Sequence, residues 1–113
     1  MLQRITEIIE KLDIERKVAF EFCNGNFVIP LAKIFEKVYV VSDFKTAETL
    51  RKKLENLNIN NVGIIVSEGQ FDIDFKVNLV LFSNTSYLNK YVKLARKADY
   101  VIVIGSSFQV ILI

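Results

Sequence analysis

Four short polar segments of this 113-residue chain follow apolar runs and carry side chains suited to ligand binding. They are residues 21–27, 42–44, 67–70 and 83–87. The first three segments hold one carboxylate each, at Glu21, Asp43 and Glu68. A carboxylate offers two oxygens that accept hydrogen bonds from hydroxyl or amino groups. The pattern therefore favours the binding of a polar organic ligand.

The composition excludes several other chemistries. The chain has no His and one Cys, Cys23, so it has neither an internal disulfide nor the ligands of a zinc site. Without a His to activate it, Cys23 is better interpreted as a packed or pocket-lining thiol than as a nucleophile. The chain also lacks the Gly-Lys-Ser/Thr of a phosphate-binding loop and the three-glycine pattern of a dinucleotide site.

The elements that must position the polar segments alternate between strand and helix. Apolar runs predict strands over residues 18–22, 38–41, 62–66, 77–82, 100–104 and 108–113, and helical spacing predicts helices over 2–12, 27–35, 46–57 and 87–98. This alternation predicts an α/β fold with a doubly wound, mainly parallel, Rossmann-like sheet of five to six strands and helices on both faces. The link from residue 66 to 77 is short and polar, so we expect no full helix there. In such sheets the ligand lies beyond the carboxyl ends of the strands.

Bulk properties describe one domain over residues 1–113, whose first 16 residues include an amphipathic helix that packs on the sheet. Hydrophobic residues make up 51% of the chain, which favours a sheet buried on both faces. The 15 basic and 13 acidic residues are interleaved and give no strong nucleic-acid signal. Charges throughout the first 17 residues argue against a signal peptide or a membrane span. We therefore expect a cytoplasmic protein.

The turn after the first predicted strand reads Glu21-Phe22-Cys23-Asn24-Gly25-Asn26-Phe27. It resembles the first motif of class I S-adenosylmethionine (SAM)-dependent methyltransferases, in which glycines at alternate positions follow an acidic residue. Glu21 matches the acidic position and Gly25 the middle glycine, whereas Cys23 and Phe27 replace the flanking glycines. The resemblance implies that Glu21, Cys23, Asn24 and Gly25 bind SAM. It extends in motif order over nearly the whole chain.

Two further segments match the family in position. The resemblance implies that Asp43 accepts hydrogen bonds from the ribose hydroxyls and that Phe44 lies against the adenine. Counting back from the next helix instead puts Ser42 at the acidic position, and Asp43 is also a good cap for that helix. At the end of the third strand, Glu68 and Gly69 would bind the adenine edge, although Glu-Gly is also ordinary turn sequence.

The fourth segment resembles the Asn/Asp-Pro-Pro-Tyr/Phe motif of amino-group methyltransferases, which orients the nitrogen that is methylated. Asn84 and Tyr87 match the ends of this motif and are weak catalytic candidates, because both prolines are missing. Ser83, at the end of the strand, is placed among the SAM-binding residues. The alternative is that residues 83–86 form the N-terminal cap of a helix.

These observations predict a SAM-binding, methyltransferase-like protein. Members of the family usually continue beyond the fifth strand into an antiparallel hairpin, and we expect this hairpin and its reversed edge strand to be missing here. The apolar end, residues 108–113, would form an exposed edge strand, which predicts a homodimer or a partner subunit. Oligomerisation would then complete the acceptor site of a minimal methyltransferase. The alternative is a non-catalytic nucleoside-binding or protein-interaction subunit.

Overall fold

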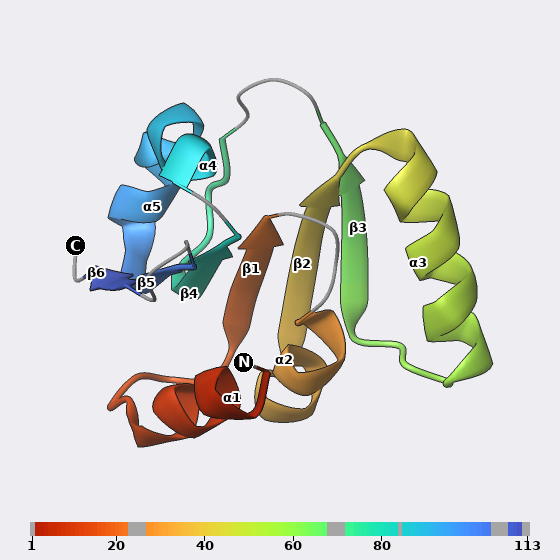
Figure 1. The fold of residues 1–113 in the computed structure, drawn as a ribbon, viewed down its shortest axis with the longest axis horizontal. Helices are drawn as coiled ribbons and strands as arrows, with labels where there is room; N and C mark the ends of the chain where they lie inside the picture. Colours follow the sequence, from red (N-terminus) through yellow and green to blue (C-terminus); the bar gives the residue numbers. More distant parts are fainter. Residues whose placement is uncertain (1, 23–26, 68–71, 84, 105–108, 112–113) are drawn as a thin grey trace.

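Six strands form a single sheet in the order β3-β2-β1-β4-β5-β6 (Figure 1). The structure is a computed structural model that describes residues 2–22, 27–67, 72–83, 85–104 and 109–111. Neighbouring strands run parallel except β6, which pairs antiparallel with β5. The strands are β1 (Val18–Phe22), β2 (Lys37–Ser42), β3 (Val62–Val66), β4 (Val77–Phe82), β5 (Ala98–Val103) and β6 (Gln109–Ile111). The doubly wound α/β sheet that the sequence predicts is confirmed.

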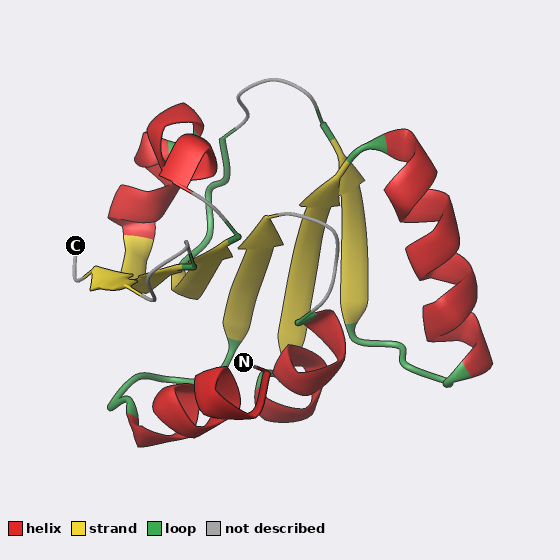
Figure 2. Cartoon of the chain, in the orientation of Figure 1, coloured by secondary structure: helices red, strands yellow, loops and turns green. Residues whose placement is uncertain are grey.

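Helices cover both faces of this sheet (Figure 2). One face packs against α1 (Leu2–Lys11), α2 (Val28–Ile34) and α3 (Phe44–Asn56) through side chains such as Ile9, Leu31 and Leu50. The other face packs against α5 (Val92–Lys97), which follows the short helix α4 (Thr85–Lys90). Along β4, Leu79 and Leu81 enter the first core and Val80 and Phe82 the second, because successive strand residues point to opposite faces.

The boundaries of α3 have clear local causes. The Asp43 side chain accepts a hydrogen bond of 2.7 Å from the Thr46 backbone N–H and so caps the first turn. At the other end Asn58 adopts a φ of 55°, the left-handed conformation in which helices commonly end and which Asn tolerates better than most residues. These two residues end the helix close to the predicted range 46–57.

The link between β3 and β4 is not helical over its described residues 72–76. It is held to α5 by Lys97, whose Nζ lies 2.5 Å from Asp72 and 2.6 Å from the Ile73 carbonyl oxygen. The Phe75 ring packs over Phe20 and Tyr39, with centroid distances of 6.2 and 5.6 Å. An aromatic ring therefore covers part of the sheet face.

Two details of the second half of the chain differ from expectation. Residues 87–98 form two helices instead of one, because Tyr91 leaves helical geometry (ψ 38°) between them. Its ring is buried 4.4 Å from the Phe22 ring, a contact between distant parts of the chain that the continuous helical spacing does not reveal. A reversed edge strand is present, because β6 runs antiparallel to β5 over Gln109–Ile111, although no further strand follows it among the described residues.

No helix in the described part of the chain is long and apolar enough to span a membrane.

Candidate functional site

The carboxyl ends of β1, β2, β3 and β4 lie side by side at one edge of the sheet. Phe22, the last residue of β1, pairs with Val41 of β2 and with Phe82 of β4, and Ser42 pairs with Val66 of β3. The chain order reverses between β1 and β4, which makes this edge the topological switch point. Ligands of open α/β sheets bind at such a point.

Glu21 is fully buried in β1, one residue before the turn. Its Oε1 accepts a hydrogen bond of 2.9 Å from the backbone N–H of Phe27, the residue just before α2. Glu21 therefore joins the two ends of the turn. Cys23, Asn24 and Gly25, predicted to bind SAM, lie outside the described residues.

Ser42 and Asp43 occupy the end of β2. Ser42 is buried, and its hydroxyl donates to the Asp43 carbonyl oxygen at 3.1 Å. The Asp43 carboxylate is exposed, and its hydrogen bond from the Thr46 backbone N–H is the main cause that lowers the pKa of this carboxyl. Asp43 is thus an ionised acceptor at neutral pH. The alternative that Asp43 caps the next helix is confirmed, while its ribose contact stays a prediction.

Two exposed apolar residues lie near Asp43: Phe44 follows it in the chain, and Val66 pairs with Ser42. Phe44 is 69% exposed and Val66, at the end of β3, is 51% exposed. Large exposed apolar side chains at a ligand edge offer a surface for a flat ring. Glu68 and Gly69, predicted to bind the adenine edge, lie outside the described residues.

At the end of β4 the Ser83 backbone N–H donates to the Phe22 carbonyl oxygen at 3.2 Å and so extends the pairing of β1 and β4. Asn84 lies outside the described residues. Tyr87, in α4, has its ring centroid 6.5 Å from that of Phe22. Tyr87 therefore lies beside Phe22, the last residue of β1.

A cleft of about 190 Å³ lies at this edge between the ends of β2 and β3 and the helical segment 87–91. Its described lining residues are Val41, Ser42, Asp43, Ser67, Tyr87, Lys90 and Tyr91. Pockets that enclose a whole ligand usually measure about 300–1,000 Å³, so this cleft suits one part of a ligand, such as a sugar. Ser67 belongs to the segment 67–70 that the sequence indicates, but Lys90 and Tyr91 were not predicted. Their position depends on how the segment between β4 and β5 packs against the sheet, which local sequence does not encode.

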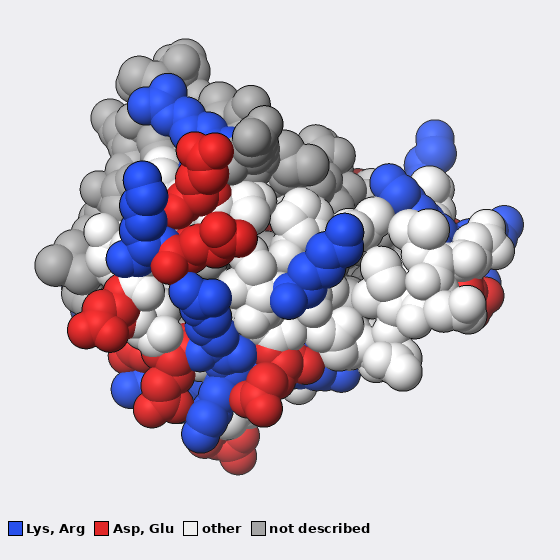
Figure 3. All heavy atoms as spheres, turned by 90° about the horizontal axis from the view of Figure 1, so that it is seen from below, with Lys and Arg blue, Asp and Glu red and all other residues white. Residues whose placement is uncertain are grey.

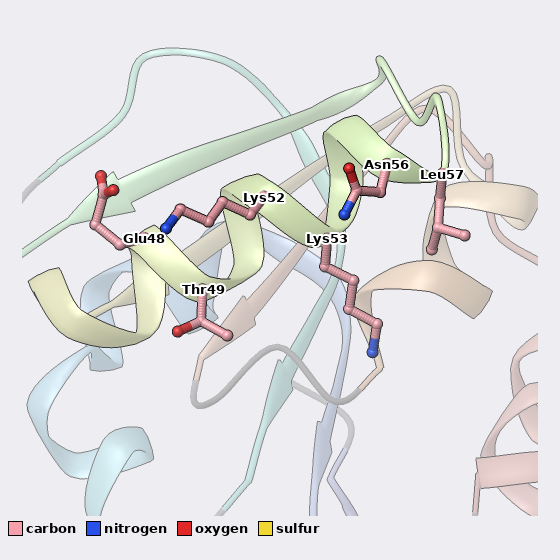
Figure 4. Close-up of a pocket in the computed structure, with 6 residues that line it drawn as sticks. All are labelled: Glu48, Thr49, Lys52, Lys53, Asn56 and Leu57. Carbon is pink, nitrogen blue, oxygen red and sulfur yellow. The ribbon is translucent and has the colours of Figure 1, made fainter.

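Other hollows are weaker candidates. A depression of about 470 Å³ lies on the outer surface of α3, and its labelled side chains, among them Glu48, Lys52 and Lys53, point in different directions (Figure 4). A groove of about 550 Å³ between α1 and α2 has a floor that includes Ile29 and Pro30. The surface around α1 and α2 shows interleaved positive and negative side chains (Figure 3). Among the described residues no group of His, Cys, Asp and Glu is arranged to hold a metal ion.

Comparison with known proteins identifies the fold. No protein-family model and no curated protein matches the sequence. Solved structures do match, including a protein of Streptococcus mutans assigned as a methyltransferase and bound to S-adenosylhomocysteine (SAH), at a TM-score of 0.75 and 18% identity. A SAM-dependent methyltransferase from Clostridium acetobutylicum matches at a TM-score of 0.76 and 16% identity, and an rRNA methylase from Streptococcus thermophilus at 0.66 and 14%.

The matches cover 89%, 94% and 88% of this chain, respectively. The chain in turn spans 69% of the S. mutans protein, 69% of the S. thermophilus protein and about half (51%) of the C. acetobutylicum enzyme. At these identities the comparison shows the fold alone. The chain has the Rossmann-like α/β fold of class I SAM-dependent methyltransferases, as the sequence motifs predict.

Proposed function

We propose that this protein binds SAM or SAH at the carboxyl edge of its sheet. The observation that supports the proposal most is the cleft at this edge, which is lined from the ends of β2 and β3 and from the segment after β4. Its polar groups fit the nucleoside part of this ligand. The Asp43 carboxylate is an acceptor for ribose hydroxyls, and the exposed Phe44 ring beside it is a surface for adenine.

We further propose that the protein is a minimal methyltransferase whose acceptor site is completed by oligomerisation. SAM supplies an electrophilic methyl group on a sulfonium, so the residues of the chain need only bind and orient the two reactants. The support for this proposal is the fold, which is that of the SAM-dependent methyltransferases described above.

The proposed oligomer is a homodimer through β6, or a complex with a partner subunit at that edge. β6 is the last strand of the sheet and pairs with β5 alone among the described strands. We expect sedimentation equilibrium to give the mass of a dimer. The Val110→Lys variant should sediment as a monomer, since a charge on an edge strand opposes strand pairing. A wild-type monomer in the absence of any partner would contradict the homodimer.

The alternative function is a non-catalytic subunit that keeps the nucleoside site. It is favoured by the fully buried Glu21, whose hydrogen bond to the Phe27 N–H is a structural contact that needs no catalytic role. Incubation with labelled SAM and candidate acceptors distinguishes a methyltransferase from a protein that only binds SAM. Release of SAH supports an enzyme, whereas tight binding without turnover supports the alternative.

The binding proposal is tested by thermal unfolding with SAM, SAH, NAD and ATP in parallel. A ligand at about 100 times its Kd stabilises a protein by roughly 2.7 kcal/mol, which raises the melting temperature of a small domain by the order of ten degrees. We expect such a shift with SAM and SAH only.

The sharpest variant is Asp43→Ser, because Ser retains the helix cap and removes the carboxylate. It should unfold like the wild type and lose most of the shift. The matched control, Asp72→Ser, changes an exposed carboxylate on the β3–β4 link and should leave the shift intact. No shift with SAM or SAH, or an equal shift in Asp43→Ser, would contradict the proposed site.

A further inference from the structure

The cleft at the carboxyl edge has a second wall that the sequence motifs do not indicate. Ser42 and Asp43 line it from the end of β2, and Ser67 lines it from the end of β3. The opposite side is formed by the segment between β4 and β5, through Tyr87, Lys90 and Tyr91. The residues from β2 and those from the β4–β5 segment are more than forty positions apart in the sequence, and they line the same cleft.

Buried aromatic contacts hold this wall in place. The Tyr91 side chain is 4% exposed, and its ring centroid lies 4.4 Å from that of Phe22 at the end of β1. Its backbone N–H donates to the Tyr87 carbonyl oxygen at 2.9 Å. The Lys90 Nζ lies 5.6 Å from the centroid of the Tyr91 ring, which keeps the ammonium beside the cleft. The helical turn from Tyr87 to Tyr91 is thus fixed on the end of β1.

The hydrogen-bond donors and acceptors that line the cleft indicate which chemical group of a ligand would fit there. Asp43 provides an acceptor, one of whose oxygens already receives the Thr46 N–H. The Ser42 hydroxyl donates to the Asp43 carbonyl oxygen. Lys90 provides three N–H donors and no acceptor. A hydroxyl group both donates and accepts, so a pair of adjacent hydroxyls satisfies a carboxylate on one side and an ammonium on the other.

We propose that Lys90 is a specificity-determining residue that makes the cleft bind the 2′,3′-diol of a ribose, and that Tyr87 adds affinity without selecting the diol. Lys90 donates to a diol oxygen whose proton is donated to Asp43, and the Tyr87 ring covers the sugar. This inference rests on the proposed function, because it places the nucleoside of that ligand in this cleft. A phosphate group is disfavoured there, since the Asp43 carboxylate repels it.

The experiment compares the binding of adenosine, 2′-deoxyadenosine and 3′-deoxyadenosine by calorimetry, with SAH as the reference ligand. The wild type should bind adenosine about tenfold or more tightly than either deoxynucleoside, which is the usual effect of one lost hydrogen bond to a charged group. In Lys90→Met, affinity for adenosine should fall about tenfold and the preference over the deoxynucleosides should shrink. A general structural defect would weaken all three ligands equally and leave this ratio unchanged.

Two further variants complete the test. Lys93→Met removes an exposed lysine of α5 that does not line the cleft, and it should bind like the wild type. Tyr87→Ala should weaken all three nucleosides without changing their ratio. If SAH binds and Asp43→Ser loses it, but Lys90→Met keeps both affinity and ratio, the inference is wrong and the proposed function stands. If the wild type binds neither SAH nor adenosine, both fail.

Discussion

At the residue scale, Glu21 illustrates how a motif position and a structural role coincide. The carboxyl group is buried, and its Oε1 is hydrogen-bonded to the Phe27 N–H across the turn. This contact joins the end of β1 to the residue just before α2. The fold therefore requires a hydrogen-bond acceptor at the position of Oε1, and a neutral acceptor would serve there as well as a charged one.

We expect Glu21→Gln to keep the fold and bind SAH within a few-fold of the wild type, because the amide oxygen can still accept from Phe27. Glu21→Ala should lower the free energy of unfolding by about 1–3 kcal/mol, the usual effect of leaving a buried N–H without its partner. Urea unfolding and calorimetry measure the two effects. A loss of binding in Glu21→Gln as large as in Glu21→Ala would show instead that the carboxylate charge contacts the ligand.

Gly63, in β3, lies so close to the Tyr39 ring that a side chain at this position would overlap with it. A Cβ at this position would lie 2.9 and 3.0 Å from two ring carbons of Tyr39. That ring packs against Phe20, at a centroid distance of 4.9 Å, and against Phe75, so it has little room to move. Gly63→Ala should destabilise the protein by about 1–2 kcal/mol through this overlap.

A double-mutant cycle separates the overlap from any backbone effect of the substitution. In a Tyr39→Leu background the methyl group added by Gly63→Ala meets a smaller side chain, so this change should be nearly neutral there. Urea unfolding of the four proteins gives the comparison. An equal destabilisation in both backgrounds would place the cause in the backbone of β3.

At the scale of elements, Asn78 joins three strands at the edge opposite the candidate site. Its Oδ1 accepts from the Lys17 and Val18 N–H groups at 3.2 and 3.0 Å, and its Nδ2 donates to Asp99 at 3.0 Å. Asn78 is 2% exposed, so these bonds are shielded from water. Asp99 also forms an ion pair of 3.0 Å with Lys76.

The hydrogen bond from Asn78, aided by Lys76, lowers the pKa of the Asp99 carboxyl below its usual value of about 3.9. A carboxyl whose pKa is lowered by folding stabilises the protein above the unfolded pKa. This contribution is lost as the pH falls from about 4 through the folded pKa. The difference in unfolding free energy between the wild type and Asp99→Asn should therefore shrink between pH 7 and pH 3. A difference that is the same at both values would contradict this role.

Replacing the donor by an acceptor gives the complementary test. Asn78→Asp keeps the oxygen that serves Lys17 and Val18 but turns a carboxylate toward Asp99. We expect a destabilisation of about 2–3 kcal/mol at pH 7, when a charge-assisted hydrogen bond becomes a repulsion. The second change Asp99→Asn should restore most of it, because the amide it introduces can donate to the new carboxylate at position 78. Absence of this rescue would mean that the two side chains do not act as a pair.

Sequence reasoning succeeded for elements whose signals are local. β1, β3 and β4 have the predicted bounds, because each is a short apolar run between polar residues. The break at Tyr91 was missed because it depends on a ring contact with Phe22, far away in the chain. The antiparallel direction of β6 was not predicted for a related reason. An apolar run predicts a strand, but it does not indicate whether that strand runs parallel or antiparallel to its neighbour.

At the scale of the whole molecule, the topology explains why the candidate site could be predicted only in part. Parallel strands bring their carboxyl ends to one edge, so Glu21, Asp43 and Tyr87 could be assigned to that edge from their places after apolar runs. The position of α4 across the cleft from the ends of β2 and β3 then added Lys90, which no motif indicates. One wall of the cleft thus follows from strand order, and the other from tertiary contacts.

The most direct test of the binding site is a titration of the ¹⁵N-labelled protein with SAH, followed through its amide resonances. We predict concentration-dependent shifts at the strand ends, in residues 21–27, 42–44, 67–70 and 83–91, and small changes on the outer surface of α3 around Lys52. Binding there would join the predicted motifs and the cleft in one site. Shifts confined to α3 or to the groove between α1 and α2, or no shifts with excess SAH, would contradict the proposed function.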